Sequence, residues 1–134
     1  MAAWTARRFF AALRDLAPLR VISRCGPSTF EAICDFGPHG FAEGHMNAIT
    51  PAYHWHLRLD GFRWLRSHDE VHARSGRRVL FFELRERADA LPFLFLYVHR
   101  ERGAEFDPDR EAAFAALHAE LAQGASLAAE ETAR

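Results

Sequence analysis

The segment Tyr53-His-Trp-His-Leu-Arg-Leu-Asp60 indicates how this chain folds, because apolar and polar side chains alternate along it. Such alternation is typical of a β-strand with one buried and one exposed face. The buried face is expected to carry Trp55, Leu57 and Leu59. The exposed face is expected to carry the polar side chains of His54, His56, Arg58 and Asp60. The segment therefore predicts a strand that presents two imidazoles and a guanidinium on one side.

Further strands are expected on both sides of this segment. Gly26-Pro27-Ser28 and Ser75-Gly76 are turn signals, each placed between two strand-like runs. The run from Pro92 to Val98 is apolar on both faces, so we expect helices to cover one face and a partner or ligand the other. The expected strands cover residues 19–25, 29–36, 41–49, 53–60, 62–73, 79–86 and 93–100.

Helices are expected at both ends of the chain. Residues 3–17 carry apolar side chains at three- and four-residue spacings and are followed by Pro18, which predicts a helix that ends there. Asp107 is a good N-cap for a second helix, which Gly124 ends. This order predicts an α+β fold, an antiparallel β-sheet with flanking N-terminal and C-terminal helices. We expect one domain over residues 1–124 and a flexible tail over residues 125–134.

The composition limits the classes of function that fit this chain. A chain of 134 residues with 49% hydrophobic residues is long enough for a single domain with a large core. The net charge of −1 argues against nucleic acid or an anionic membrane as the main partner. All 17 basic residues are arginine, so the chain has no lysine for Schiff-base or P-loop chemistry. No run of about 18 apolar residues is present, so we expect no membrane span.

The two cysteines indicate a compartment. In the predicted hairpin, Cys25 and Cys34 lie near opposite ends of the strand pair, beyond the reach of a disulfide. Unpaired thiols are typical of a reducing compartment. We expect no N-terminal secretion signal, because Arg7 and Arg8 interrupt the early apolar residues. We therefore expect a cytoplasmic protein.

Two groups of residues are candidates for binding a ligand. His54, His56 and Arg58 share one strand face, and two imidazoles beside a positive charge suit a metal or a metal-bearing cofactor with acidic groups. His99 and Arg100 end the last expected strand, where basic side chains suit the acidic groups of a ligand. The structural alternative for both groups is that they are ordinary polar residues facing water.

The remaining histidines carry less information. His45 and Met46 follow Gly44 in an irregular segment and are further candidate metal ligands. His68 and His72 alternate with acidic residues and are expected on an exposed edge. The chain has no Gly-x-Ser-x-Gly nucleophile motif and no paired carboxylates, so we expect binding rather than catalysis.

Four segments resemble the haem-utilisation proteins of the HemS/ChuS and ChuX/HutX group. Ile49–Leu59 is similar to a strand that carries a His or His-Trp in that group. Val79–Glu83 resembles its Leu-x-Phe-Phe-Asp/Asn strand, and Phe95–Arg100 resembles the strand that follows. His39–Phe41 is similar to a His-Gly-Tyr region of the shorter carriers.

The resemblance implies a single-repeat intracellular haem carrier with a large antiparallel sheet that pairs as a homodimer. Its candidate iron ligands are then His45, His54 and His56, and its candidate propionate ligands are Arg58 and Arg100, with His99 nearby. The chain departs from the family pattern where the shorter carriers have Gly-His-Ile, because it has Asn47-Ala48-Ile49. A second family histidine, expected near residue 23 or 24, is also replaced.

Two alternatives stay open. His54 and His56 followed by Asp60 are similar to the first metal motif of cupins, with His99 as the further ligand that a cupin-like metal-binding protein requires. The other alternative is a non-catalytic dimeric module that has lost its haem site. We consider it because Ala48 stands where the resemblance implies a histidine.

Overall fold

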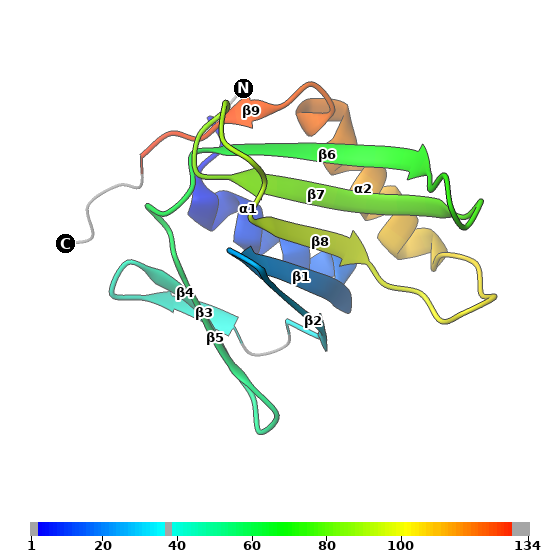
Figure 1. Ribbon diagram of the computed structural model, residues 1–134, viewed down its shortest axis with the longest axis horizontal. Helices are drawn as coiled ribbons and strands as arrows, with labels where there is room; N and C mark the ends of the chain where they lie inside the picture. Colours follow the sequence, from blue (N-terminus) through cyan, green and yellow to red (C-terminus); the bar gives the residue numbers. More distant parts are fainter. Residues whose placement is uncertain (1–2, 37–38, 130–134) are drawn as a thin grey trace.

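A six-stranded antiparallel sheet makes up the larger part of the molecule (Figure 1). The computed structural model describes residues 3–36 and 39–129. The six strands, in their order across this sheet, are β2 (Ser28–Cys34), β1 (Leu19–Cys25), β8 (Leu94–Val98), β7 (Arg78–Arg85), β6 (Trp64–Val71) and β9 (Ala125–Ser126). A second antiparallel sheet contains β3 (His39–Ala42), β4 (His45–Ile49) and β5 (His54–Arg58).

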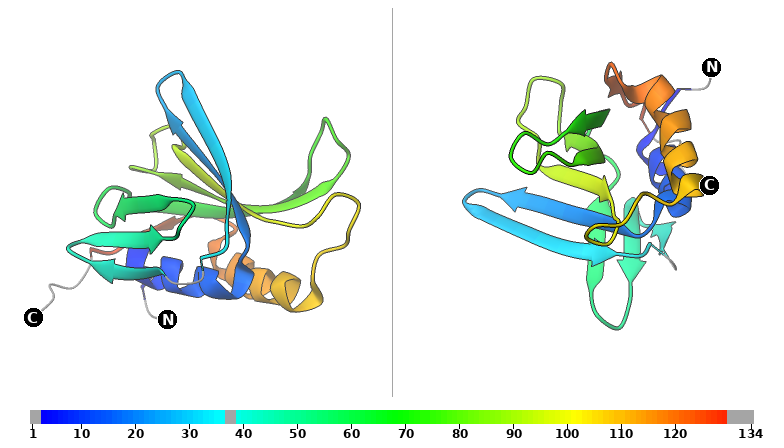
Figure 2. Two further views of the ribbon diagram at one scale, coloured as in Figure 1. Left: turned by 90° about the horizontal axis from the view of Figure 1, so that it is seen from below. Right: turned by 90° about the vertical axis from the view of Figure 1, so that its right-hand side faces the viewer.

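Both helices lie on one side of the six-stranded sheet, as the two views of Figure 2 show. The first is α1 (Ala6–Ala12), continued by the 3-10 turn η1 (Leu13–Leu16), and the second is α2 (Pro108–Leu121). Asp107 caps α2, because its side chain accepts a hydrogen bond from the Arg110 N–H. This arrangement confirms the predicted α+β fold. Within the described residues, no helix is long and apolar enough to cross a membrane.

The core lies between the helices and the sheet, and phenylalanines connect its layers. The Phe9 ring of α1 contacts the Phe82 ring of β7, with 5.1 Å between ring centroids, and the Phe82 ring contacts that of Phe114 of α2, with 5.2 Å between centroids. Phe10, the next residue of α1, contacts Phe62 and Trp55, which joins the second sheet to the same core. Burial of these rings is the main source of stability for this packing.

The segment predicted as one strand over residues 41–49 forms two. β3 and β4 are joined at Glu43 and Gly44, whose φ angles of 53° and 74° are those of a tight hairpin turn. Glu43 is an uncommon residue in this left-handed conformation, so the sequence carried no strong turn signal there. The prediction of a single strand was therefore wrong.

The predicted hairpin over residues 19–36 is confirmed, with a register that differs by one residue. Cys25 pairs with Ser28 and Cys34 pairs with Leu19, so the loop contains two residues instead of three. The two cysteines are free, as expected, with Cys25 exposed and Cys34 buried.

The C-terminal segment corrects the predicted start of a flexible tail at residue 125. Residues 125–126 form β9 against β6, and the Leu127 side chain is only 7% exposed. Ala128 then forms a parallel bridge with Thr5. Residues 125–128 therefore pack with the domain, and residues 130–134 lie outside the described residues.

Candidate functional site

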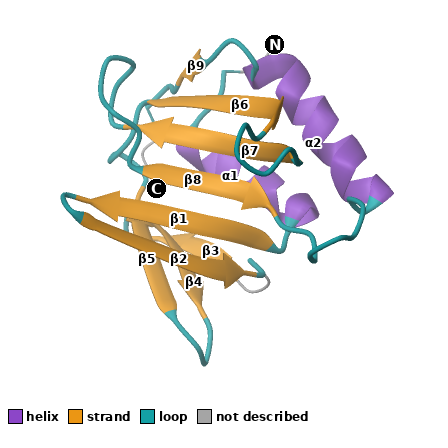
Figure 3. Cartoon of the chain, turned by 45° about the vertical axis from the view of Figure 1, so that its right-hand side comes forward, coloured by secondary structure: helices purple, strands orange, loops and turns teal. Residues whose placement is uncertain are grey.

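The face of the six-stranded sheet that is turned away from the helices, here called the outer face, is covered by no helix of the described chain (Figure 3). It faces the viewer in Figure 3, with α1 and α2 behind it. Arg20, Tyr97, Phe81 and His68 are direct cross-strand neighbours on β1, β8, β7 and β6, so they form one row across this face. The Phe81 ring stacks on both neighbours, with ring centroids 4.6 Å from His68 and 4.6 Å from Tyr97.

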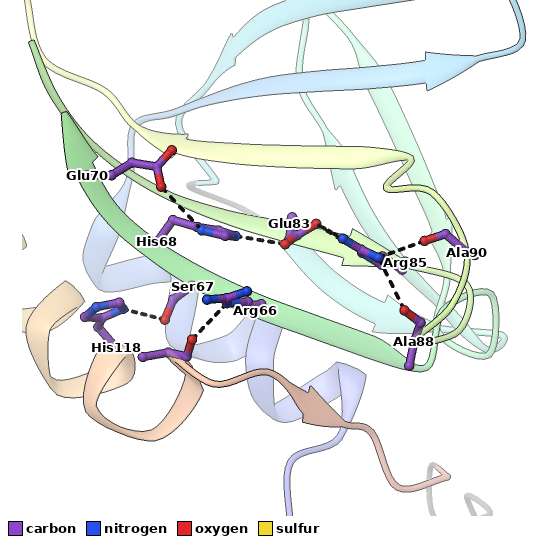
Figure 4. Close-up of polar contacts among 10 residues, drawn as sticks. Arg66, Ser67, His68, Glu70, Glu83, Arg85, Ala88, Ala90 and His118 are labelled. Atoms are coloured by element: carbon purple, nitrogen blue, oxygen red, sulfur yellow. Dashed lines mark hydrogen bonds and ion pairs between the residues drawn. The ribbon is translucent and has the colours of Figure 1, made fainter. Parts of the chain in front are cut away.

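The row ends at a buried carboxylate that the sequence did not single out. Glu83 is 6% exposed, and its Oε1 lies 2.8 Å from Nε2 of His68. Its Oε2 accepts hydrogen bonds from the Arg85 guanidinium, which also donates to the carbonyls of Ala88 and Ala90 (Figure 4). The expectation that His68 belongs to an exposed edge was therefore wrong. A glutamate within the apolar run of β7 was the signal that a partner was required.

A hollow of about 360 Å³ lies at the other end of the outer face, and we call it the arginine hollow. Its cationic lining comes from β1, from β7 and the turn before it, and from the segment after β8. Its apolar lining includes Ile22, Val79, Tyr97 and Phe106. The arginines that line it are Arg20, Arg77, Arg78 and Arg100, together with the imidazoles of His72 and His99.

Two of the four guanidiniums are neutralised by carboxylates. Arg78 binds Asp69 with two hydrogen bonds and also pairs with Glu111 of α2, while Arg20 donates to Glu31 at 2.8 Å. The hydrogen bonds from the Arg78 guanidinium hold the pKa of Asp69 below its usual value, and the same contacts raise the pKa of Arg78. These two arginines are therefore committed to structural ion pairs.

The other two guanidiniums are available to a ligand. Arg100 stacks over the Phe106 ring at 3.9 Å and donates one hydrogen bond to the Arg78 carbonyl. The Arg77 guanidinium makes no hydrogen bond or ion pair with residues 3–36 or 39–129. Because neither cation is paired with a carboxylate, an acidic ligand would meet two unneutralised charges in this hollow.

The two imidazoles of the arginine hollow differ in their available nitrogens. His72 Nδ1 accepts a hydrogen bond from the Ser75 N–H, so the proton of the neutral ring is on Nε2, which then has no lone pair for a metal. His99 has a side chain that is 15% exposed, and its nearest polar partner is the Glu101 carboxylate at 3.5 Å. His99 is therefore the better candidate metal ligand.

A second hollow, of about 650 Å³, lies beside β4 and β5, and we call it the histidine hollow. The faces of β5 are as predicted, with His54, His56 and Arg58 exposed and Trp55 and Leu57 half-buried. The Arg58 guanidinium donates to Asp60 at 2.9 Å, and this contact lowers the pKa of Asp60. The residues that line this hollow are polar or charged apart from Gly61: His45, His56, Arg58, Asp60, Glu86 and Arg87.

Comparisons with known proteins identify the fold. No protein-family model matches the sequence, and no curated protein is significantly similar to it. A solved protein from Erwinia carotovora superposes with a TM-score of 0.70 at 16% identity, over 88% of this chain and 74% of that one. The heme-binding protein ChuX superposes with a TM-score of 0.67 at 10% identity, over 85% of this chain and 70% of that one. This chain has a ChuX-like fold.

A third similar structure is holo-PhuS, a heme-binding protein from Pseudomonas aeruginosa. It superposes with a TM-score of 0.62 at 14% identity, over 84% of this chain and 33% of PhuS. The ChuX-like fold consists of two open sheets, whereas the cupin-like alternative requires a closed barrel with His54 and His56 inside, so that alternative is wrong. The described part of the chain also contains no group of three or more residues that could hold a metal ion.

The ChuX-like fold separates the predicted site residues between the two hollows, apart from His54, which lines neither of them. His45, His56 and Arg58 line the histidine hollow, whereas His99 and Arg100 line the arginine hollow. The histidine hollow adjoins the residues after β7, and the arginine hollow adjoins the start of β7. The length of β7 places the two hollows roughly 25 Å apart. One ligand therefore meets only one of the two groups.

The two candidate metal ligands His45 and His54 also lie far apart in this fold. His45 pairs with Arg58 and His54 pairs with Ile49, so the two histidines are four positions apart along the ladder. At the rise of a β-strand this is about 13 Å, too far for one iron atom to bind both. His45 and His54 therefore remain alternative candidates, and a single iron site takes only one of them.

Ala48, at the position where the resemblance implies a histidine, faces the core of the ChuX-like fold. It is 2% exposed and lies between His39 and Trp55 in the strand pairing. His39 is 5% exposed, and its Nδ1 donates to the Phe36 carbonyl, while its Nε2 is buried without a hydrogen-bond partner among the described residues. The missing imidazole would therefore lie beside another buried histidine and outside both hollows.

Proposed function

We propose that this protein binds haem in the arginine hollow, with His99 on the iron and Arg77 and Arg100 on the propionates. The observation that carries the proposal is the combination of an apolar wall, an imidazole and two unneutralised guanidiniums in one hollow. Imidazole is a standard axial ligand of haem iron, and arginine suits a carboxylate. Two proteins of the same fold, ChuX and PhuS, are named as heme-binding, which supports the proposal.

The donor set of the arginine hollow fits haem better than that of the histidine hollow. Haem is a flat apolar macrocycle with acidic groups at one edge, so it requires apolar contacts as well as charge. Tyr97 and Phe106 supply aromatic contacts in the arginine hollow, which has a volume at the lower end of the range for ligand sites. The histidine hollow offers two imidazoles, but it has no apolar side chain among the residues lining it.

In this proposal the protein is a cytoplasmic haem carrier that acts by binding haem and forms a homodimer. The outer face supports a dimer, because the apolar strand β8 is covered by helices on one side only and exposes Phe95 and Tyr97 partly on the other. Free Cys25 and Cys34 support a reducing compartment.

A hemin titration followed in the Soret region tests the haem proposal. We expect saturation at one haem per chain, at least a ten-fold loss of affinity in His99→Ala, and a smaller loss in Arg100→Ala. His56→Ala is the matched control from the other hollow and is expected to bind as the wild type does. Loss of binding in His56→Ala with none in His99→Ala would place haem in the histidine hollow and contradict the proposal. A titration without saturation would favour a dimeric module that binds no haem.

A further inference from the structure

The exposed face of the second sheet carries two histidine rings close together. His54 and His56 alternate on β5 and share its outward face. Their ring centroids are 6.2 Å apart and their planes are nearly perpendicular, at 88°. Both side chains are exposed, so no packing prevents small rotations of either ring. This pair is distinct from the proposed haem site, since neither residue lines the arginine hollow.

One of the two rings is oriented by a hydrogen bond that leaves its other nitrogen available for coordination. His56 Nδ1 donates a hydrogen bond to Oδ1 of Asn47, its cross-strand partner on β4, at 2.7 Å. A carbonyl oxygen only accepts, so Nδ1 carries the proton and Nε2 keeps its lone pair. A hydrogen bond of this kind is the usual way in which proteins orient a metal-ligating histidine. His54 makes no hydrogen bond or ion pair elsewhere in residues 3–36 or 39–129, so its ring is free to turn toward His56.

The spacing of the two rings matches that of two ligands on one ion. Metal–nitrogen bonds to imidazole are about 2.0–2.1 Å, which places the ion about 3.2 Å from each ring centre. Two rings on one ion therefore have centres up to about 6.4 Å apart, and the observed 6.2 Å lies just inside this limit. The next residue on this face, Arg58, would repel a cation, but its charge is compensated by Asp60 at 2.9 Å.

We propose that His54 and His56 together bind one late first-row divalent metal ion, and that Asn47 positions the His56 ring. Imidazole suits copper, nickel and zinc, and copper(II) binds such nitrogen ligands most tightly. No third ligating side chain joins the pair in the part of the chain that is described, so water completes the coordination. The ion thus binds at an exposed, two-histidine site on the second sheet.

A copper(II) titration of haem-free protein, followed by calorimetry and by electron paramagnetic resonance, tests this site. We expect one ion per chain, hyperfine splitting from imidazole nitrogen, and at least a ten-fold loss of affinity in His54→Ala and in His56→Ala. Asn47→Leu is expected to weaken binding about ten-fold, because the anchor of the His56 ring is lost. His72→Ala removes a histidine from a distant turn and is the matched control. Since the substituted side chains are exposed or half-buried, circular dichroism should report an unchanged fold.

Two results would overturn the proposal. Equal copper affinity in wild type, His54→Ala and His56→Ala would show that the ion binds non-specifically. Loss of binding in His45→Ala with none in His54→Ala would place the ion in the histidine hollow. The haem proposal is tested separately, because His99→Ala is expected to bind copper as the wild type does.

Discussion

Nε2 of His68 lies 2.8 Å from the buried Oε1 of Glu83, although the two residues are on different strands and 15 positions apart. The contact is completed on one side by Arg85, which binds the other carboxylate oxygen, and on the other by Phe81, on which the imidazole stacks. A buried carboxylate is tolerated only when it is paired and hydrogen-bonded. The outer face of the sheet therefore contains a polar group that is part of its structure.

Replacing this carboxylate should destabilise the fold. Glu83→Gln keeps the size of the side chain but removes the charge that His68 and Arg85 bind, so we expect a loss of about 2 kcal/mol in the free energy of unfolding. Urea denaturation measures this loss of stability. Glu70→Gln is the control, since Glu70 is exposed and 3.7 Å from His68, and it should change stability by less than about 0.5 kcal/mol. Equal effects of the two substitutions would contradict a structural role for Glu83.

The Asp69–Arg78 pair should contribute to the pH dependence of stability. Hydrogen bonds from Arg78 lower the pKa of Asp69 from its usual value of 3.8. A carboxyl whose pKa is lower in the folded than in the unfolded chain stabilises the fold above its unfolded pKa, and this contribution is lost as the pH falls through the folded pKa. Asp69→Asn should therefore be less stable than wild type at neutral pH, with a difference that shrinks below pH 3.8.

Chemical denaturation at a series of pH values checks the prediction for Asp69. Asp89→Asn is the matched control, because Asp89 also pairs with an arginine but has a side chain that is 82% exposed. A pH profile of Asp69→Asn that runs parallel to that of the wild type would contradict the prediction.

The C-terminal segment should contribute to stability beyond the end of α2. Leu127 is 7% exposed in the core, so Leu127→Ala is expected to cost about 2–3 kcal/mol in the free energy of unfolding, as buried leucines usually do. Thermal or urea unfolding measures the loss. Ser126→Ala, at the exposed neighbouring position, should have little effect. A Leu127→Ala variant as stable as wild type would return the segment to the flexible tail that the sequence suggested.

The two thiols should react at very different rates. Cys25 is exposed at the end of β1, whereas Cys34 is buried, and its burial raises the pKa of the thiol. Since the thiolate is the reactive species, a chromogenic disulfide reagent should modify one thiol rapidly in the folded protein and the second only on unfolding. Cys25→Ser should abolish the rapid phase. A rapid phase that persists in Cys25→Ser would contradict the burial of Cys34.

Features that depend on local sequence were predictable. The alternating faces of β5 and the cap of α2 at Asp107 follow from period-two patterning and from capping chemistry, which involve neighbouring residues only. The turn at Glu43 and Gly44 was missed, because a glutamate with positive φ is stabilised by the pairing of β3 with β4 and not by its own preference.

The sequence by itself determined the α+β class, the free thiols and the presence of residue types whose chemistry suits a metal or an acidic ligand. Only the tertiary structure decided which of these residues meet. It placed His99 and Arg100 in one hollow and His56 and Arg58 in another, and it brought Glu83 to His68. The physical reason is that side-chain alternation specifies which face of a strand a residue occupies, whereas strand order and register specify its neighbours across the sheet.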